Sequence, residues 1–449
     1  MRSRSGGYDA IDASARTAIA RTLTFEGIWV AGGQVAAVAG ALVGIRLITE
    51  VLDPAAYGEL ALGLTIANLA NQTIVGPLTN GISRYYAPSA QTGDVNGYLA
   101  AARWLFLAGA GATALLSVLA VLALVATDHR KWIAIALAAL LYAFINGCST
   151  ALMGIFNAAR MRRVVAFHQG IEPCLRFTTA ALLATSIAAT STMAMIGFVV
   201  STLVMTVSQW AFFTRLIRRH ATSATEPRDW RTDIWRYSWP FSAWGLFSWA
   251  QQSTDRWALE VFATTDDVGR YAVLYQLGYQ PTALAAATLL QLLTPILFER
   301  AGDARDRNRN AAVNRMIWRV TLMILTITIA MALLASLFHA AIVGVLAAKE
   351  YSVVQHLLPW MLLAGGVFAA GQAISLGLMS QLRSREMIVA KIATSLLGIG
   401  LNVAGARLYG LDGVVFAGVL YSAVYLFWMA VLAARTGRNA ASAVSTLDG

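Results

Sequence analysis

The stretch RLITEVLDPAAYGELAL, residues 46–62, has a counterpart in RWALEVFATTDDVGRYAV, residues 256–273. Both stretches read Arg-x-x-x-Glu-Val, then a turn, then a glycine, Gly58 or Gly269, that opens the next apolar run. The spacing between these features differs by one residue. Such self-similarity indicates that the chain is built from two halves with the same plan.

The composition indicates what kind of chain the two halves form. Of the 449 residues, 58% are hydrophobic and only 13% are charged, whereas a soluble domain carries about 25% charged residues. The mean hydropathy is +0.61, and apolar runs long enough to cross a bilayer recur from Trp29 to Ala434. The sequence therefore predicts an all-α polytopic membrane protein.

Hydropathy predicts twelve transmembrane helices, six in each half. They are expected at residues 24–48, 57–83, 98–126, 131–158, 165–188, 191–217, 234–262, 268–298, 315–346, 355–381, 386–407 and 412–434. Because six is even, both halves start on the same side, which predicts two six-helix bundles related by a pseudo-two-fold axis along the membrane normal. The predicted domains are an N-terminal bundle, 1–217, a basic cytoplasmic connector, 218–233, and a C-terminal bundle, 234–449.

The distribution of basic residues predicts the orientation. Of the 34 Lys and Arg residues, 26 lie on the side of the two predicted termini, 7 lie on the opposite side and Arg176 lies in mid-span. Cytoplasmic loops carry such an excess, so both termini are expected in the cytoplasm. The same rule explains the net charge of +11, and no nucleic-acid partner is expected.

Polar residues follow one face of predicted spans two and eight. The face in span two carries Thr65, Asn68, Gln72 and Thr79, and the face in span eight carries Gln276 and Gln280. Polar groups are costly against lipid, so these faces are expected to point at protein or water. Cavity lining and interhelical hydrogen bonds are both open. The Gly76-Pro77 pair predicts a kink in span two.

Span seven carries a third polar face with an aromatic at its start. Trp244, Ser248, Gln251 and Asp255 share this face. Trp244 either stacks on a sugar ring or packs as an ordinary aromatic. Trp239, Trp249 and Trp257 lie on roughly the opposite face and are expected to face lipid or the interface.

Span five contains two full charges in an apolar run. His168, Glu172, Arg176 and Thr179 form a stripe, and Pro173 frees a backbone carbonyl within it. Glu172 and Arg176 stand one turn apart and can pair. The pair is either a self-neutralising structural feature or part of a charged cavity wall. We expect Arg176 to face the substrate and Glu172 to hold and tune it.

The sequence lacks the motifs that define several other classes of protein. There is no G-x-x-x-x-G-K-[ST] motif for ATP, and the five histidines are scattered. Cys148 and Cys174 both fall in predicted spans, so neither a disulfide framework nor a cysteine metal site is expected. No predicted loop is long enough for a catalytic domain. The sequence predicts a transporter without catalytic residues, metal or cofactor, rather than an enzyme.

Four stretches carry a resemblance to a known family. They are IRLITEVLDPAAYGELALGLTIANL from residue 45, GPLTNGISRYYAPS from residue 76, MGIFNAARMRRVVAFHQGIEPCLRF from residue 153 and STDRWALEVFATTDDVGRYAVLYQL from residue 253. Arg46 ends span one, Arg84 and Tyr85 close span two, and Asp255 and Arg256 pair in span seven. The chain resembles the bacterial polysaccharide and O-antigen flippases, the Wzx-type transporters of the multidrug/oligosaccharidyl-lipid/polysaccharide exporter superfamily.

The resemblance implies a fold and a substrate. The fold would be two bundles around a V-shaped central cavity. The substrate would be a polyprenyl-pyrophosphate-linked oligosaccharide, flipped from the inner to the outer leaflet of the bacterial inner membrane for lipopolysaccharide or related polysaccharide biosynthesis. Other polysaccharide-assembly proteins would be partners. The lipid II flippase of the same superfamily has fourteen spans, so the chain departs from it.

The sequence thus predicts a lipid-linked oligosaccharide flippase that works by alternating access. The candidate substrate-binding residues are Arg176, Glu172, Arg84, Arg46, Arg256, Asp255, Asn68, Gln72, Trp244, Gln251, Gln276 and Gln280. We expect Arg256, with Asp255, to fix the outer end of span seven and Arg46 to play the matching part in span one. The alternatives are a cation-coupled drug or metabolite exporter and a membrane enzyme that acts on lipid-linked glycans.

Overall fold

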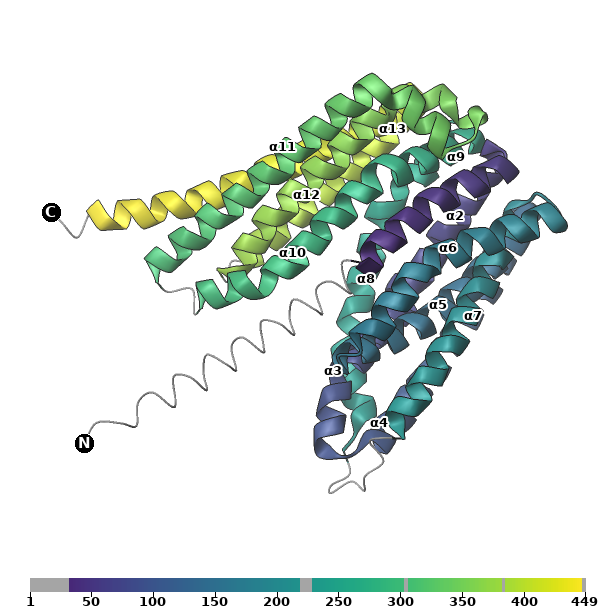
Figure 1. The fold of residues 1–449 in the computed structure, drawn as a ribbon, viewed down its shortest axis with the longest axis horizontal. Helices are drawn as coiled ribbons and strands as arrows, with labels where there is room; N and C mark the ends of the chain where they lie inside the picture. Colours follow the sequence, from purple (N-terminus) through teal and green to yellow (C-terminus); the bar gives the residue numbers. More distant parts are fainter. Residues whose placement is uncertain (1–31, 219–227, 303–305, 382–383, 446–449) are drawn as a thin grey trace. The chain divides into compact units, whose positions relative to one another are not determined.

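The computed structural model describes residues 32–218, 228–302, 306–381 and 384–445, and these residues contain helices but no strands (Figure 1). The first half consists of a first helix, Gly32–Val51, followed by α2 (Pro54–Ala70), η1 (Asn71–Val75), α3 (Gly76–Thr92), α4 (Val95–Ala126), η2 (Arg130–Trp132), α5 (Ile133–Ala158), α6 (Arg162–Ser186) and α7 (Ser191–Ile217). The start of the predicted span at 24–48 lies outside the described residues.

The second half repeats this plan. It consists of α8 (Trp230–Phe262), α9 (Thr265–Leu274), η3 (Tyr275–Tyr279), α10 (Gln280–Ala301), α11 (Arg307–Leu346), η4 (Lys349–Leu357), α12 (Leu358–Ser380) and α13 (Ser384–Ser445). The last of these is two helices joined at Gly410, whose φ of 56° and ψ of −133° are not helical and suit glycine. Within the described ranges, the segments match the twelve predicted spans, and the predicted fold class is confirmed.

By length and composition alone, seven stretches of the described residues could cross a membrane. They are Gly32–Val51, Val95–Ala126, Arg130–Ala158, Ser191–Ile217, Asn308–Leu346, Lys349–Ser380 and Met387–Arg435. Charged residues make α6 and α8 less apolar, and π-helical turns interrupt the rods α2–α3 and α9–α10. The helices that fall short of a simple hydropathy criterion are therefore the ones that carry the polar faces.

The two π-helical turns occupy related places in the two halves. The first, Asn71–Val75, closes with the Gly76 amide donating to the Asn71 carbonyl, and the second, Tyr275–Tyr279, closes with the Gln280 amide donating to the Tyr275 carbonyl. A proline follows each turn, Pro77 or Pro281. Proline displaces the carbonyl four residues earlier, and a wide turn accommodates that. The disturbance predicted at Gly76-Pro77 thus takes the form of a π-turn.

The chain forms two compact units. Among the described residues, the first unit contains 32–48 and 66–246, and the second contains 49–65 and 247–445. Helices α2 and α8 are each divided between the two units, α2 after residue 65 and α8 after residue 246. The predicted division at residues 217 and 234 stays a prediction, because compact units and sequence repeats need not share boundaries.

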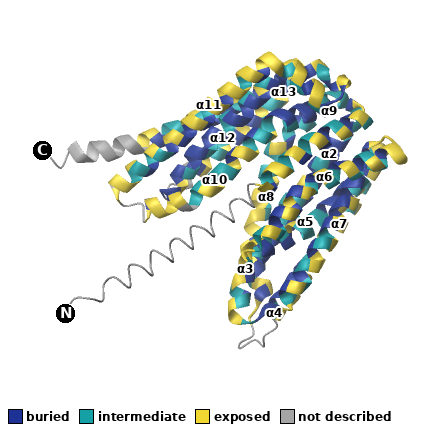
Figure 2. Cartoon of the chain, in the orientation of Figure 1, coloured by how far each residue is buried: buried dark blue, intermediate teal, exposed yellow. Residues whose placement is uncertain are grey.

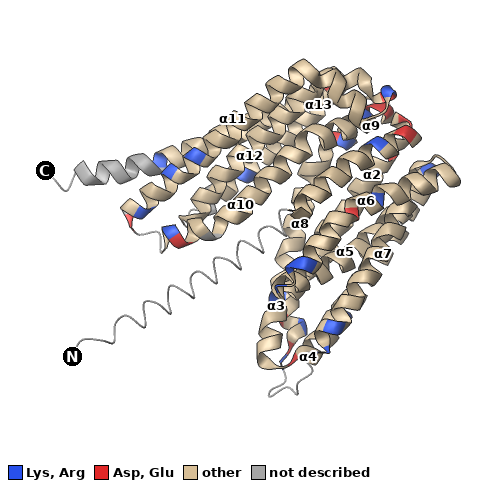
Figure 3. Cartoon of the chain, viewed as in Figure 1, with Lys and Arg blue, Asp and Glu red and all other residues tan. Residues whose placement is uncertain are grey.

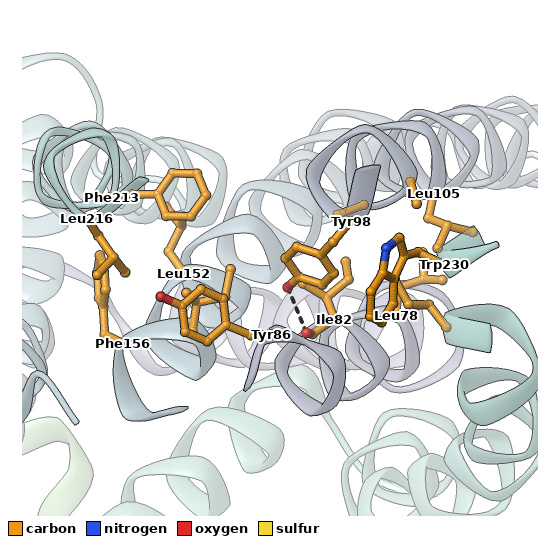
Figure 4. Close-up of a cluster of buried hydrophobic side chains, with 14 of the residues drawn as sticks. Leu78, Ile82, Tyr86, Tyr98, Leu105, Leu152, Phe156, Phe213, Leu216 and Trp230 are labelled. Carbon is orange, nitrogen blue, oxygen red and sulfur yellow. Dashed lines mark hydrogen bonds between the residues drawn. The ribbon is translucent and has the colours of Figure 1, made fainter. Parts of the chain in front are cut away.

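The first unit has an aromatic core between α3, the starts of α4 and α8, and the ends of α5 and α7 (Figure 4). Trp230 and Tyr98 are fully buried there, and the Tyr98 hydroxyl donates to the Ile82 carbonyl at 2.7 Å. The Trp230 indole N–H donates to an Asp94 carboxylate oxygen at 2.7 Å. Because Asp94 also caps α4 by accepting from the Gly97 amide, the core fixes the start of α8 against α4.

In the second unit the repeated glycines lie against each other. A Cβ on Gly58 would collide with the Thr265 carbonyl oxygen, and a Cβ on Gly269 would collide with the Pro54 carbonyl oxygen. Helices α2 and α9 therefore cross with backbone on backbone. The motif that reveals the repeat in the sequence is also the place where its two copies meet.

The surface of each unit is that of a membrane protein. Exposed residues cover the outer faces of the helices while buried residues lie between them (Figure 2). On α4 and α11 the exposed residues include Leu115, Leu122, Leu333 and Leu337, which suits contact with lipid. Charged residues gather near the ends of helices and are sparse along their middles (Figure 3). The exceptions include Glu172 and Arg176 on α6, Asp255 and Arg256 on α8, and Lys391 on α13.

Candidate substrate-binding sites

Arg176 on α6 lies in a box of aromatic rings within the first unit. Its Nη1 is 3.1 Å from Oε1 of Glu172 and donates to the Tyr142 hydroxyl at 3.4 Å. Its guanidinium carbon lies 5.2 Å from the ring centre of Phe177 and 5.4 Å from that of Phe198. Ring faces attract cations, so α5, α6 and α7 together stabilise this charge.

The box leaves the ion pair partly accessible. The side chains of Arg176 and Glu172 are 26% and 32% exposed. Such a half-exposed pair contributes about 1 kcal/mol or less to stability in water. The phenylalanine rings attract the guanidinium without accepting its N–H groups in ordinary hydrogen bonds. An anionic ligand could therefore exchange with Glu172 at the same guanidinium.

The rest of the span-five stripe is structural. His168 is buried, with Nδ1 2.8 Å from the Val164 carbonyl and Nε2 3.1 Å from the Ser208 hydroxyl on α7. Pro173 lies buried inside α6, which runs through it without a break. Thr179 is half-buried, and its hydroxyl donates to the Leu175 carbonyl at 2.6 Å. Hence Glu172 and Arg176 are the accessible charged groups of the stripe.

The remaining candidates of the first unit occupy several helices. Arg84 and Asn68 are exposed on α3 and α2, while Gln72 in the π-turn and Arg46 on the first helix are half-buried. Trp244 on α8 is 46% exposed. The predicted face of span two is divided, since Thr79 is buried and its hydroxyl donates to the Gly147 carbonyl at 3.4 Å. Thr65, which precedes the π-turn, is buried as well, so buried residues flank the exposed Asn68 and the half-buried Gln72.

Asp255 and Arg256 form a buried cluster in the second unit. The Tyr271 hydroxyl donates to Asp255 Oδ2 at 2.7 Å, and Arg256 Nη1 is 3.3 Å from Asp255 Oδ1. The Arg256 guanidinium carbon lies 4.6 Å from the ring centre of Tyr275. The side chains of Arg256 and Asp255 are only 15% and 9% exposed. The cluster ties α8 to α9 and η3. Its role as an anchor of the outer end of span seven stays a prediction.

A ladder of aromatic rings runs on from this cluster. Tyr275 and Tyr279 stack with ring centres 4.8 Å apart, and Tyr279 leads to Phe368 on α12 at 6.3 Å. Phe368 stacks with Tyr421 on α13 at 5.7 Å. These four side chains are half-buried, so each keeps some ring surface accessible. The spacing of tyrosines 271, 275 and 279 could have revealed one side of the ladder in the sequence.

Amides and one lysine accompany the ladder. Gln251 donates from Nε2 to the Tyr421 hydroxyl at 2.6 Å. Gln372 Oε1 accepts from the Tyr425 hydroxyl at 3.1 Å and from Lys391 Nζ at 3.3 Å. Lys391 falls within the predicted span 386–407, and the structure places it seven residues into α13, about 10 Å along the helix. These groups form a polar, aromatic region of the kind that binds sugars. We call it the tyrosine region: Gln251, Tyr275, Tyr279, Phe368, Gln372, Lys391, Tyr421 and Tyr425.

Two tryptophans of span seven face protein. Trp249 donates from Nε1 to the Thr65 carbonyl at 2.7 Å, and Trp257 donates from Nε1 to the Thr65 hydroxyl at 2.9 Å. The expectation that both face lipid or the interface is wrong, because the buried Thr65 supplies two acceptors on α2. Trp239 is 55% exposed, in agreement with the prediction for that residue.

The two glutamines of span eight differ in their surroundings. Gln276 lies within the π-turn η3 and is half-buried, whereas Gln280 begins α10 and is exposed. The wide turn between them separates side chains that a regular helix would align. Their assignment to a shared binding face stays a prediction. No group of three or more metal-ligating side chains occurs among the described residues.

Comparison with known proteins identifies the family. Residues 24–301 match the family model described as polysaccharide biosynthesis protein. The chain belongs to this family. No curated protein sequence matches it. The family membership predicted from the four stretches is therefore confirmed over more than half of the chain.

Solved structures share the fold at low sequence identity. An inward-facing MATE family transporter of the MOP superfamily matches with a TM-score of 0.68 and 13% identity, covering 91% of this chain and 95% of that one. The lipid II flippase MurJ, in an inward closed conformation, matches with 0.65 and 11%, covering 90% and 86%. A MATE transporter variant from Vibrio cholerae matches with 0.62 and 14%, covering 95% and 98%.

Family and fold together define the class of protein. The chain is a multi-pass membrane protein of polysaccharide biosynthesis and a flippase or exporter rather than an enzyme. The family model ends at residue 301, so it spans the Asp255–Arg256 cluster and the first half of the ladder. Phe368, Tyr421 and Tyr425 lie beyond it.

Proposed function

We propose that the protein flips a polyprenyl-pyrophosphate-linked oligosaccharide from the inner to the outer leaflet of a bacterial cytoplasmic membrane by alternating access. The tyrosine region carries this proposal. Ring faces stack on the apolar faces of sugars, and amide and hydroxyl groups satisfy sugar hydroxyls. Gln251, Gln372 and Tyr421 offer such groups beside Tyr279 and Phe368. An exporter of apolar drugs would have little use for them.

The charged head group fits the arginines. A pyrophosphate is a strong acceptor of paired N–H donors, and the planar guanidinium supplies these better than an ammonium does. Arg176 is the candidate, since its side chain is 26% exposed and its ion pair with Glu172 lies within one helix. An inside-negative potential favours outward movement of an anion by about 2.3 kcal/mol per charge per 100 mV.

The other candidate residues take supporting roles in the proposal. A positively charged central cavity bounded by spans one, two, seven and eight would expose Asn68, Gln72, Gln276 and Gln280 to the head group. Trp244 would offer a ring to a sugar. Arg46 and Arg84 would add positive charge, while Asp255 with Arg256 would anchor the outer end of span seven. Both termini would lie in the cytoplasm, with other polysaccharide-assembly proteins as partners.

Cation-coupled export of drugs or metabolites is the competing function, favoured by the fold shared with MATE transporters. Exporters of cationic compounds need carboxylates that are open to the substrate. Here Glu172 is paired with Arg176 at 3.1 Å, and Asp255 with Arg256 at 3.3 Å. These pairs favour an anionic substrate.

Transport in proteoliposomes tests the proposal. Purified protein would be reconstituted with a fluorescent polyprenyl-pyrophosphate oligosaccharide, and outward movement would be followed by the loss of fluorescence to a membrane-impermeant quencher. We expect faster movement than in protein-free liposomes and in liposomes that hold an inactive variant. Movement no faster than in these controls, together with proton- or sodium-driven uptake of cationic dyes, would support the exporter instead.

A further inference from the structure

The first unit contains a groove that the transport sites above do not use. It has a volume of about 450 Å³ and lies between α3, α4 and the start of α8. Its walls are mostly apolar, with Ile74 and Leu78 on one side and Leu105 and Ala108 on another. Leu78, Leu105 and Trp230 gather on the core side of this region (Figure 4).

The length of the groove fits one leaflet. Its lining on α8 runs from Arg231 to Ser242, about 16 Å along a helix. Half of the hydrocarbon core of a bilayer is about 15 Å. On α4 the small residues Ala108, Gly109 and Ala112 face the slot and leave space for a branched chain. A single chain fits such a slot better than the two chains of a phospholipid.

One end of the groove carries a positive charge. The guanidinium carbon of Arg231 lies 4.1 Å from the ring centre of Trp104, an arrangement that leaves the N–H edge of the guanidinium open to a phosphate. The two acids near Arg231 in the chain each have another partner. Asp233 pairs with Arg228 at 2.7 Å. Hydrogen bonds from Thr232, with a smaller contribution from Arg231, lower the pKa of Asp229. No described carboxylate forms an ion pair with Arg231.

We propose that this groove seats the polyprenyl chain of the substrate in the inner leaflet, with Arg231 at its phosphate end. The inference rests on the proposed function and on the predicted orientation, which puts the start of α8 at the cytoplasmic face. Apolar chains gain nothing by leaving lipid for an apolar wall. Packing in the slot and the contact between phosphate and Arg231 therefore select the polyprenyl lipid over the phospholipids of the membrane.

Photolabelling of the full-length protein tests the seat. The protein would be placed in phosphatidylcholine nanodiscs with a long-chain polyprenyl phosphate that carries a diazirine on its tail, and labelled peptides would be mapped by mass spectrometry. A phosphatidylglycerol probe with the same diazirine is the matched control. We expect labelling by the polyprenyl probe to concentrate on α4 and α8 around Ala108 and Ser242. The phosphatidylglycerol probe should label the same peptides much less.

Two pairs of variants separate the chain contact from the charge contact. Ala108→Trp fills the slot, and Ala114→Trp, exposed on the same helix outside the lining, is its control. Arg231→Gln removes the charge, and Arg236→Gln, exposed on the same helix, is its control. Losing a charge-assisted hydrogen bond should lower labelling about tenfold at limiting probe. Ala108→Trp should lower it at least as far, and both controls should label like the wild type.

Three results would overturn the inference: equal labelling by phosphatidylglycerol, unchanged labelling of Ala108→Trp, or lost labelling with wild-type flipping in that variant. The flipping assay distinguishes these from a failure of the proposed function. If the wild-type protein does not flip the oligosaccharide lipid, the proposed function fails. Selective polyprenyl labelling that depends on Arg231 would then still support the groove as a binding site.

Discussion

Arg176 and Arg256 each sit among aromatic rings with a carboxylate on their own helix, and their surroundings differ. Arg176 meets the rings of Phe177 and Phe198 and stays 26% exposed. Arg256 is 15% exposed, and its partner Asp255 is also bound by the Tyr271 hydroxyl from another helix. Asp255 thus accepts from a second donor, Tyr271, which holds it in place. In the Glu172–Arg176 pair, the arginine is the group that we expect to bind the substrate.

This difference separates an anchor from a binding group. A pair that is buried and held from two helices resists exchange, because breaking it leaves a charge without a partner. A pair that is half-exposed and contained in one helix can open to a competing anion at low cost. We therefore expect opposite effects of substitution at the two sites. Replacing Arg256 should mainly reduce stability, and replacing Arg176 should mainly reduce transport.

The largest effect is expected from Arg256→Ala. It leaves the buried Asp255 carboxylate with hydrogen bonds but without its cation, which should destabilise the protein by about 3–5 kcal/mol. Thermal unfolding in detergent measures the loss, and transport should fall with it. The control is Arg270→Ala, whose acidic partners are more exposed, with an expected cost of about 1 kcal/mol or less. Unchanged transport at normal expression would contradict the anchoring role.

Next in size is the effect of Arg176→Ala on transport. It should abolish flipping while the protein reaches the membrane in normal amount, since the half-exposed pair contributes little to stability. Arg176→Lys should retain part of the activity, because it keeps the charge and loses the planar fork. Flipping rates in proteoliposomes give the comparison.

Glu172→Gln should cost less transport than Arg176→Ala if the arginine binds the substrate. Arg162→Ala, at the start of the same helix, serves as a control with expected wild-type flipping. Equal losses in Glu172→Gln and Arg176→Ala, with poor membrane insertion in both, would show that the pair is only structural.

A smaller effect is expected from Tyr271→Phe. The substitution removes one hydrogen bond of 2.7 Å to a charged, buried acceptor, worth about 1.5 kcal/mol. The melting temperature should fall while transport per folded molecule stays close to that of the wild type. A loss of transport without a loss of stability would show that the Asp255 cluster is a binding site rather than an anchor.

The smallest effect is expected from Tyr142→Phe. Its hydroxyl accepts from Arg176 at 3.4 Å, so its removal should change stability by about 0.5 kcal/mol or less. Transport should remain near the wild-type rate. A drop comparable to that of Arg176→Ala would indicate that the hydroxyl itself meets the substrate.

Hydropathy predicts the helices well, because lipid selects long apolar runs, but their ends obey other rules. Helix α11 begins at Arg307 rather than at residue 315 because Asp306 caps it, accepting from the amides of Asn308 and Arg309. Its first turns, RNRNAAVNR, are polar, so a hydropathy criterion does not include them in the span. Local capping chemistry therefore extends the helix beyond its apolar part.

The candidate sites also divide into a part that the sequence predicts and a part that it does not. The Glu172–Arg176 and Asp255–Arg256 pairs are local in sequence, and periodicity finds them. Gln251 meets Tyr421 across 170 residues, and no helical period reports such a contact. Hydropathy and helical periodicity do not predict the π-turns, which change the register of the side chains on either side of them.

The crossing of Gly58 and Gly269 has a genetic consequence. The obstacle that each glycine avoids is a backbone carbonyl, and every residue carries one. A side chain gained at either position therefore has no compensating substitution at the other. In a saturation screen for suppressors, both codons should tolerate nothing but glycine. Revertants should be true revertants, in contrast to sites such as Gly377, where the neighbour is the Ile317 side chain and can itself be trimmed.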